Sequence, residues 1–133
     1  MNVSSQFVIM QHQAKRAGLH YDLRFRLPRG KKWASFASRK EIPVEYGKRV
    51  MITRTQDHTE EEALFTGEIE SGYGAGILKV WDKGSCTIIK FDPGKHIVVD
   101  FSGKKIRGIY HFLSVFKESK AETYLLFKGK DQS

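Results

Sequence analysis

Short runs of alternating or mainly apolar residues recur along the whole 133-residue chain. Turn sequences such as LPRG, DKGS, DPGK and SGKK separate most of them, as is typical of β-strands joined by short connections. The runs are FVIMQ, HYDLRFRL, KWASFA, RVMITRT, GILKVWD, CTIIKF, HIVVDF, IRGIYHFLSVF and TYLLFK. Only residues 57–65, DHTEEEALF, predict a short helix, with Asp57 or Thr59 as its N-cap. The pattern therefore predicts a mainly β protein whose antiparallel sheet closes into a barrel or folds into a sandwich. No repeat or linker divides the chain, so we expect a single domain over residues 1–133.

The run GLHYDLRFRL, residues 18–27, alternates most regularly. Its apolar residues share one face of a strand, and its polar residues share the other. The polar face presents His20, Asp22 and Arg24 in succession. Imidazole and carboxylate groups are natural ligands for Mn²⁺ or Zn²⁺, and a guanidinium group can bind phosphate with two hydrogen bonds. A solvated strand face has the same pattern, so the alternation alone leaves both interpretations open.

Positive charge is concentrated near this run. The formal net charge is +8, and residues 1–54 hold 12 Lys and Arg against 3 Asp and Glu. Such a surplus favours an anionic polymer or a phosphate group as partner, although it also serves solubility. No apolar run is long enough to span a membrane, and the first residues do not have the pattern of a signal peptide. Cys86 is the only cysteine, which excludes an internal disulfide. We expect a cytoplasmic protein with no membrane partner.

Two further histidines extend the candidate chemistry. His12 lies near the end of the first predicted strand, and the basic stretch 11–18 reads as a connection that returns the chain so that His12 and His20 approach one another. His12 is therefore a candidate third metal ligand. His58 lies between a predicted strand and the predicted helix. It is a candidate phosphate contact or general acid, and in isolation it also reads as an exposed turn residue.

The glycine-rich segment 72–84, GYGAGILKVWDKG, has neither a dinucleotide-binding nor a P-loop spacing. Its glycines instead predict a tight bend or bulge in a curved sheet. We expect Tyr73 and Trp81 to be packing residues. His96 and His111 lie in apolar runs and are expected to be structural.

Taken in order, these segments resemble the 3′-phosphoesterase domain of the bacterial and archaeal DNA ligase D family, including its stand-alone members. The matching segments are FVIMQH, LHYDLR, WASFASRKEIP, KR, QDH, FTGEI, GYGAGILKVWDKG, GKKIRG and YLLFK. They run from Phe7 to Lys128, so the resemblance covers nearly the whole chain.

The resemblance implies a compact antiparallel β-barrel with one or two short helices. It implies Mn²⁺, or another divalent cation such as Zn²⁺ or Co²⁺, held by the residues matching His12, His20 and Asp22. The implied activity is repair of DNA 3′ ends, by removal of a 3′-phosphate, a 3′-terminal ribonucleoside or both, which leaves the 3′-OH needed for ligation. The implied partners are DNA 3′ ends, some of them with terminal ribonucleotides, and a DNA ligase or polymerase.

The resemblance also assigns the residues around the cation. His20, Arg24 and His58 match catalytic positions, and Arg24 and His58 also match phosphate contacts. Arg49, in the KR pair, matches a further phosphate contact, and Lys40 lies near the lysine of the family's KGP loop.

Several positions depart from the family pattern. The spacing between His12 and His20 is longer by two residues, and one extra residue separates Arg49 from the DH pair. Gln56 stands where the family has glutamate, and Glu62 where it has tyrosine. The chain also begins at the first strand, without the extension that contributes active-site residues in ligase-fused members. These departures favour an alternative, a non-catalytic module that binds nucleic-acid ends and recruits a ligase or polymerase. A third hypothesis is a hydrolase of other phosphoesters, such as RNA 2′,3′-cyclic ends.

Overall fold

A computed structural model describes residues 2–72, 75–115 and 121–130 of the chain. Tyr73 and Gly74 of the glycine-rich segment lie outside the described residues. The described elements are β1 (Val3–Ala14), β2 (Gly18–Arg26), β3 (Lys32–Ser38), β4 (Arg49–Thr59), α1 (Glu60–Leu64), β5 (Gly67–Ile69), β6 (Gly76–Asp92), β7 (His96–Ser102), β8 (Arg107–Ser114) and β9 (Thr123–Lys128).

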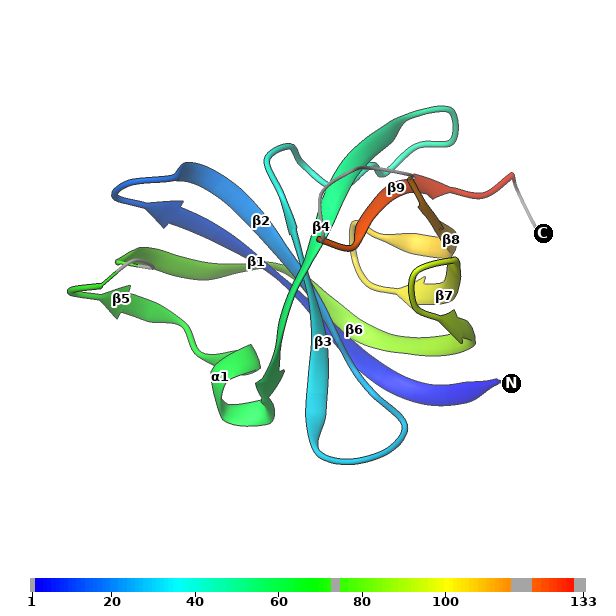
Figure 1. Ribbon diagram of the computed structural model, residues 1–133, viewed down its shortest axis with the longest axis horizontal. Coiled ribbons are helices and arrows are strands. Elements are labelled where there is room, and N and C mark those ends of the chain that lie inside the picture. The colour runs from blue at the N-terminus through cyan, green and yellow to red at the C-terminus, as the bar shows by residue number, and fades with distance from the viewer. Residues whose placement is uncertain (1, 73–74, 116–120, 131–133) are drawn as a thin grey trace.

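The strands form one antiparallel sheet that closes on itself (Figure 1). Its order is β1-β2-β3-β4-β9-β8-β7-β6-β5, and a further pairing of β1 with β6 closes an eight-stranded barrel with β5 as a short extra strand. This confirms the predicted antiparallel β-barrel and excludes the sandwich. Among the described residues, α1 is the single helix, with five residues. No helix in that part of the chain has the length and hydropathy needed to cross a lipid bilayer.

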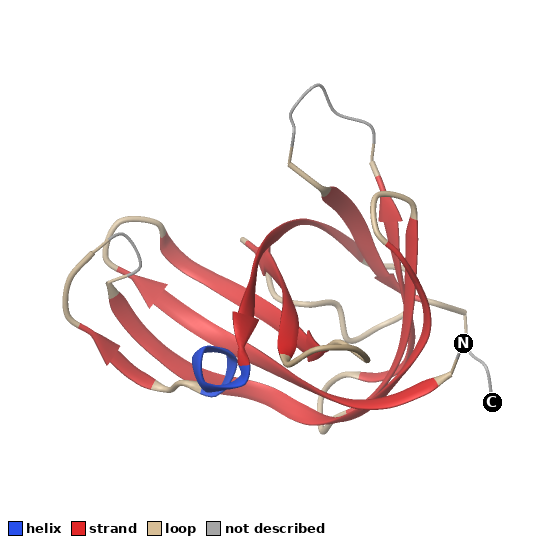
Figure 2. Cartoon of the chain, turned by 60° about the horizontal axis from the view of Figure 1, so that its bottom comes forward, coloured by secondary structure: helices blue, strands red, loops and turns tan. Residues whose placement is uncertain are grey.

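The helix forms where the sequence predicts it, and Thr59 rather than Asp57 is its N-cap. The Thr59 hydroxyl accepts a hydrogen bond from the Glu62 N–H, and the Glu62 carboxylate accepts one from the Thr59 N–H at 2.9 Å. This capping box satisfies two backbone donors at the start of a very short helix. The helix is thereby fixed directly after β4, where it covers part of the outer face of the barrel (Figure 2).

Two predicted boundaries are wrong. The sequence DKGS, expected to be a turn, lies inside the 17-residue strand β6. This strand pairs with β1 along one edge and with β7 along the other, so pairing on both sides overrides the local turn propensity. The connection expected over residues 11–18 is shorter, because residues 11–14 continue β1 and only Lys15 to Ala17 form the turn. The short strand β5 was not predicted.

Apolar residues are buried on both faces of the first strands. The barrel interior holds the larger core, which includes Phe7 and Ile9 of β1, Phe36 of β3 and the aromatic side chains of β2 and β8. A smaller cluster lies on the outer face, and its members are Val8, Met10, Trp33, Ala63 and Leu78. The outer face of β1 to β3 is therefore packed with buried side chains and is not simply exposed to solvent. This packed region continues into the candidate site.

A candidate metal and phosphate site on the outer face of the barrel

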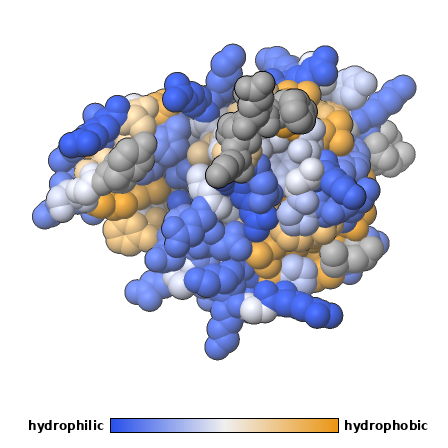
Figure 3. Space-filling model, viewed as in Figure 1, coloured by the Kyte–Doolittle hydropathy of each residue, from blue (hydrophilic) through white to orange (hydrophobic). Residues whose placement is uncertain are grey.

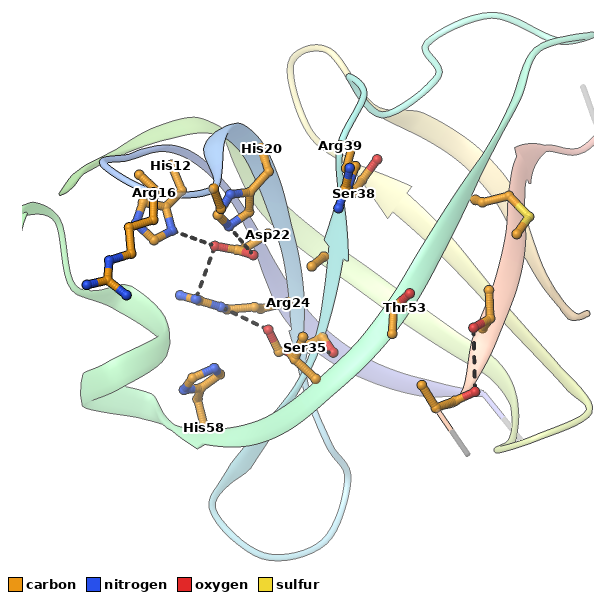
Figure 4. A pocket seen from close by; sticks show the side chains of 17 residues that line it. His12, Arg16, His20, Asp22, Arg24, Ser35, Ser38, Arg39, Thr53 and His58 are labelled. Carbon is orange, nitrogen blue, oxygen red and sulfur yellow. Dashed lines mark hydrogen bonds and ion pairs between the residues drawn. The ribbon is translucent and has the colours of Figure 1, made fainter. Parts of the chain in front are cut away.

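A hollow of about 1130 Å³ lies on the outer face of the sheet, beyond the small cluster (Figure 4). Its lining comes from the turn between β1 and β2, from the strands β1, β2, β3, β4 and β9, and from the ends of their connections. Charged and polar side chains gather at one end of it. Those lining residues that bear on the chemistry are His12, Arg16, His20, Asp22, Arg24, Ser35, Ser38, Arg39, Thr53, Thr55, His58 and Thr123.

His12, His20 and Asp22 converge at this end. The pairing of β1 with β2 sets His12 directly opposite His20, and their ring centroids are 4.5 Å apart. Asp22 follows His20 by two residues and so shares its face. Its carboxylate lies 3.6 Å from His12 Nδ1 and 3.5 Å from His20 Nε2. One ligand atom from each residue falls within 4.8 Å of the others.

The electrostatics of these residues suit a cation. Burial alone would raise the pKa of Asp22, but the hydrogen bond with His20 and the charge of Arg24 outweigh it and lower that pKa. The same hydrogen bond raises the pKa of His20. An ionised carboxylate between two imidazoles is a donor set that Mn²⁺, Zn²⁺ and Co²⁺ accept. The residues therefore fit a divalent cation, whose charge would take the place of an imidazole proton beside Asp22.

Arg24 lies next to this triad and is held on three sides. Its guanidinium group approaches Asp22 Oδ2 at 3.5 Å and donates hydrogen bonds to Ser35 Oγ at 3.2 Å and to the Ala63 carbonyl at 3.1 Å. The Ala63 carbonyl is available because it lies in the last turn of α1, where carbonyls lack helical partners. Burial lowers the pKa of Arg24, yet a guanidinium group stays charged in proteins. The arginine is thus a fixed positive charge beside the triad.

His58 faces the same hollow from the end of β4 (Figure 4). Its side chain is 29% exposed, and its Nδ1 lies 3.6 Å from the Glu62 carboxylate. Burial and the nearby charge of Arg24 lower the pKa of His58. The lowered pKa favours the neutral imidazole, which has one donor and one acceptor nitrogen, and Nδ1 is the nitrogen that faces Glu62.

The structure does not bring every predicted site residue into the hollow. Arg49 begins β4 and is exposed, two residues before Met51, which lines the hollow on the same face. Lys40 is exposed in the connection after β3, where its backbone hydrogen-bonds the Ser38 hydroxyl. Its neighbour Arg39 lines the hollow instead and lies beside Ser38 at the rim (Figure 4).

Other lining residues escaped the sequence analysis. Arg16 reaches the hollow from the β1–β2 turn, while Ser35, Thr53 and Thr55 line it from β3 and β4. The floor of the hollow could have been found in the sequence from an alternation of small residues. These are Ser35 and Ala37 on one strand and Thr53 and Thr55 on the next. His96 and His111, expected to be structural, lie on β7 and β8 outside the lining, with His96 Nε2 2.9 Å from His111 Nδ1.

Comparison with known proteins points to one family. Residues 10–114 match the family model described as the DNA ligase D 3′-phosphoesterase domain. The chain is 35% identical over 97% of its length to the multifunctional non-homologous end joining protein LigD of Mycolicibacterium smegmatis. It is 39% identical over 95% of its length to the protein of that name from Mycobacterium bovis, and 31% identical over 95% to that from Pseudomonas aeruginosa. The chain spans only 15–17% of the length of these relatives.

Proposed function

Because the chain belongs to the DNA ligase D 3′-phosphoesterase domain family, we propose that it is a Mn²⁺-dependent phosphoesterase that heals the 3′ ends of DNA. Its action would remove a 3′-phosphate, a 3′-terminal ribonucleoside or both, and leave a 3′-OH for ligation. One observation carries the proposal beyond family membership. The ligand atoms of His12, His20 and Asp22 converge within 4.8 Å in the hollow that also exposes Arg24 and His58.

In this proposal, His12, His20 and Asp22 hold the divalent cation. When bound, the cation supplies Lewis-acid polarisation of the phosphoryl group. The three residues need little ordering to do so, because opposed β1 and β2 positions already set their spacing. Asp22 also holds the guanidinium of Arg24, so one carboxylate orients both positive groups that face the substrate.

Arg24 is proposed to bind the phosphate oxygens. A terminal phosphate carries between one and two negative charges near pH 7, roughly −1.5 to −2, and a guanidinium fork matches two of its oxygens. The contacts with Ser35 and Ala63 restrain Arg24 before substrate arrives. A positive charge that needs no reorganisation during the reaction stabilises charge as it develops.

His58 is proposed to hydrogen-bond the phosphate or to move a proton to the departing 3′ oxygen. Its pKa is lowered in the free protein by burial and by Arg24. An arriving phosphate brings negative charge that opposes the effect of Arg24, so the imidazole gains proton affinity when substrate binds. This coupling would make the proton available only when a substrate is present.

The rest of the hollow is proposed to hold the nucleic acid that carries the phosphate. Hydroxyl-bearing side chains on its floor, including Thr53, Thr55 and Thr123, suit contacts with sugars and phosphate oxygens. Arg16 and Arg39 line it, and the exposed Lys40 and Arg49 lie outside its lining as further phosphate contacts along the strand. The relatives are named as non-homologous end joining proteins, which supports a role of the proposed activity in end joining. We further propose that it acts inside the cell, together with a DNA ligase or polymerase.

The proposal is tested with a primer-template that ends in a 3′-phosphate and a second that ends in a 3′-ribonucleotide. Each is incubated with the protein and Mn²⁺, Mg²⁺, Zn²⁺, Co²⁺ or a chelator, and the 3′-OH product is resolved on a gel. We expect turnover with Mn²⁺ that His20→Ala and His58→Ala abolish and that His96→Ala, outside the hollow, retains. Absence of turnover by the wild-type protein with every cation would overturn the proposal.

A second candidate function keeps the site but not the chemistry. Glu62, which stands where the family has tyrosine, is engaged by Thr59 and faces His58 at 3.6 Å. A carboxylate beside His58 opposes further negative charge at a reacting phosphate, which favours a module that binds the nucleic acid through the rest of the hollow without cleaving its end. This module would show salt-sensitive DNA binding that survives His20→Ala. Loss of DNA binding on metal chelation would exclude it.

A further inference from the structure

The strand β4 contains a β-bulge immediately before His58. Ser35 pairs with Thr55 and Trp33 pairs with His58, so three steps along β4 match two steps along β3. Successive residues of a regular strand point to opposite faces, and a single extra residue reverses every side chain beyond it unless a bulge absorbs it. The bulge therefore determines that His58 faces the hollow together with Thr55.

The bulge also accounts for the extra residue between Arg49 and the DH pair. Arg49, Met51, Thr53 and Thr55 alternate along one face of β4, and Met51, Thr53 and Thr55 line the hollow. Without the bulge, His58 would fall on the barrel side of β4. The local geometry of residues 56 and 57 thus decides whether the imidazole reaches the site at all.

Arg54 holds the bulge from the barrel side. Its Nη2 donates to Asp57 Oδ1 at 3.0 Å, and Asp57 directly precedes His58. Adjacent strand residues point to opposite faces, so an Asp57 fixed on the barrel side directs His58 toward the hollow. The Arg54 side chain is only 15% exposed, and this partial burial makes the ion pair stronger than one on an open surface.

Arg54 is in turn braced by its surroundings. Its backbone N–H donates to the Glu122 carbonyl at 2.8 Å, and its Nη1 lies 3.5 Å from Glu122 Oε1. Its guanidinium group also lies 5.5 Å from the centre of the Phe91 ring. These contacts connect the bulge of β4 to Glu122, the residue directly before β9, and to Phe91 of β6.

We propose that Arg54 is a positioning residue for His58, acting through Asp57 and the bulge without contacting the substrate. The inference rests on the proposed phosphoesterase function only for its consequence in catalysis. Arg54 faces away from the hollow and would leave metal and phosphate binding unchanged. Its loss would lower turnover because the imidazole no longer has a fixed place.

The chain offers a matched control. Lys48 and Glu45 form another pair three residues apart, just before β4, but their side chains are 70% and 69% exposed and the two atoms are 3.9 Å apart. Glu45→Gln therefore removes an ion pair of the same spacing that bears on no bulge.

The test compares Arg54→Gln, Arg54→Lys and Glu45→Gln with wild type on the 3′-phosphate primer-template. We expect kcat of Arg54→Gln to fall roughly 10- to 100-fold, the loss that a small misplacement of a reacting group produces. KM and Mn²⁺ affinity should stay within about twofold. Arg54→Lys should recover part of the loss, and Glu45→Gln should match wild type. Thermal melting gives the folded fraction of each variant, and kcat is expressed per folded molecule. The inference would be overturned if kcat for Arg54→Gln equalled that for Glu45→Gln.

A variant that lacks Gln56 tests the bulge itself. Removal of Gln56 allows β4 to pair regularly with β3 and leaves His58 on the side of the hollow. Arg54→Gln should therefore reduce kcat much less in this deletion variant than in the wild-type protein. An undiminished loss in this background would also contradict the inference.

A second readout separates this inference from the proposed function. The His58 ring resonances, assigned by comparison with His58→Gln, should shift in Arg54→Gln and stay in place in Glu45→Gln. If wild type shows no turnover, the proposed function fails, and these resonances alone decide the inference. Unshifted resonances in Arg54→Gln would refute it.

Discussion

His12 on β1 and His20 on β2 are directly opposed residues of one antiparallel pair, with their ring centroids 4.5 Å apart. The turn between them can therefore vary without separating them. Two added residues lengthen such a hairpin by one pair and leave opposed residues opposed. The longer spacing of this chain relative to the family pattern is accommodated in this way, with Gly18 at φ +76° ending the turn.

Removing one ligand of this triad should weaken cation binding. Asp22→Asn is expected to reduce Mn²⁺ affinity by at least about 10-fold, the loss seen even when a residue only orients a ligand. The binding is measured by titration followed by electron paramagnetic resonance, which detects free Mn²⁺. His96→Ala, which removes a histidine outside the hollow, is the control and should bind like wild type. Equal affinity in Asp22→Asn and wild type would show that Asp22 is not a ligand.

The pH dependence of stability should report the environment of His58. Its pKa in the folded protein is lowered by burial and by Arg24, whereas the unfolded chain takes up a proton near the ordinary value of about 6.5. Below that value the unfolded state binds more protons, so the folded state loses stability as pH falls toward the folded pKa.

His58→Gln removes this contribution. In the presence of a chelator, the free energy of unfolding of wild type should decrease more between about pH 7.5 and about pH 5.5 than that of the variant. Urea unfolding at the two pH values provides the comparison. The pKa values of His96 and His111 are also lowered, but both residues remain in both proteins and cancel in the difference. Parallel curves would contradict the assigned direction.

The part of the site that the sequence predicts best is the part that is local. His20, Asp22 and Arg24 share a face because they follow one another at every second position of one strand, and the alternation of β2 shows this directly. The core face of that strand is equally legible, since Tyr21, Leu23 and Phe25 are all buried in the barrel interior. For such a segment, period alone determines orientation.

Features that depend on distant pairing were beyond the sequence. The turn residues of DKGS are incorporated into β6 because β1 and β7 hydrogen-bond to that strand from both sides. Likewise, Arg39 lines the hollow and Lys40 does not. The course of the connection after β3, which the sequence pattern does not determine, sets which of these two side chains reaches the hollow. The bulge before His58 shows the same limit, since a count along β4 alone puts that residue on the wrong face.

Close packing of β6 against β1 requires glycine at one position of the glycine-rich segment, Gly76. Gly76 pairs with Ala14 and has φ +151°, and a Cβ there would collide with the Gln13 carbonyl and lie 2.7 Å from the Ala14 Cα. We expect Gly76→Ala to reduce the free energy of unfolding by about 3 kcal/mol. Gly94→Ala is the control, because φ is also positive there, +81°, but no atom lies within 4 Å. It should cost about 1 kcal/mol, the conformational penalty alone. Urea unfolding that ranks the two equally would refute a packing role for Gly76.

Asp82, within the VWDKG segment, should act on stability and not on the site. Its buried carboxylate accepts hydrogen bonds from four backbone N–H groups, those of Lys83 at 2.9 Å, Lys104 at 3.0 Å, Lys105 at 3.0 Å and Ile106 at 2.8 Å. It thereby fixes the turn between β7 and β8 on β6.

Asp82→Ala leaves these donors without their acceptor and should cost about 3 kcal/mol or more of unfolding free energy. Asp82→Asn, which retains one acceptor oxygen, should cost less. Mn²⁺ affinity measured on the folded fraction should equal that of wild type in both variants, because the triad lies on β1 and β2. A loss of affinity without a loss of stability would mean that this segment, which matches the family pattern, belongs to the site and not to the frame that supports it.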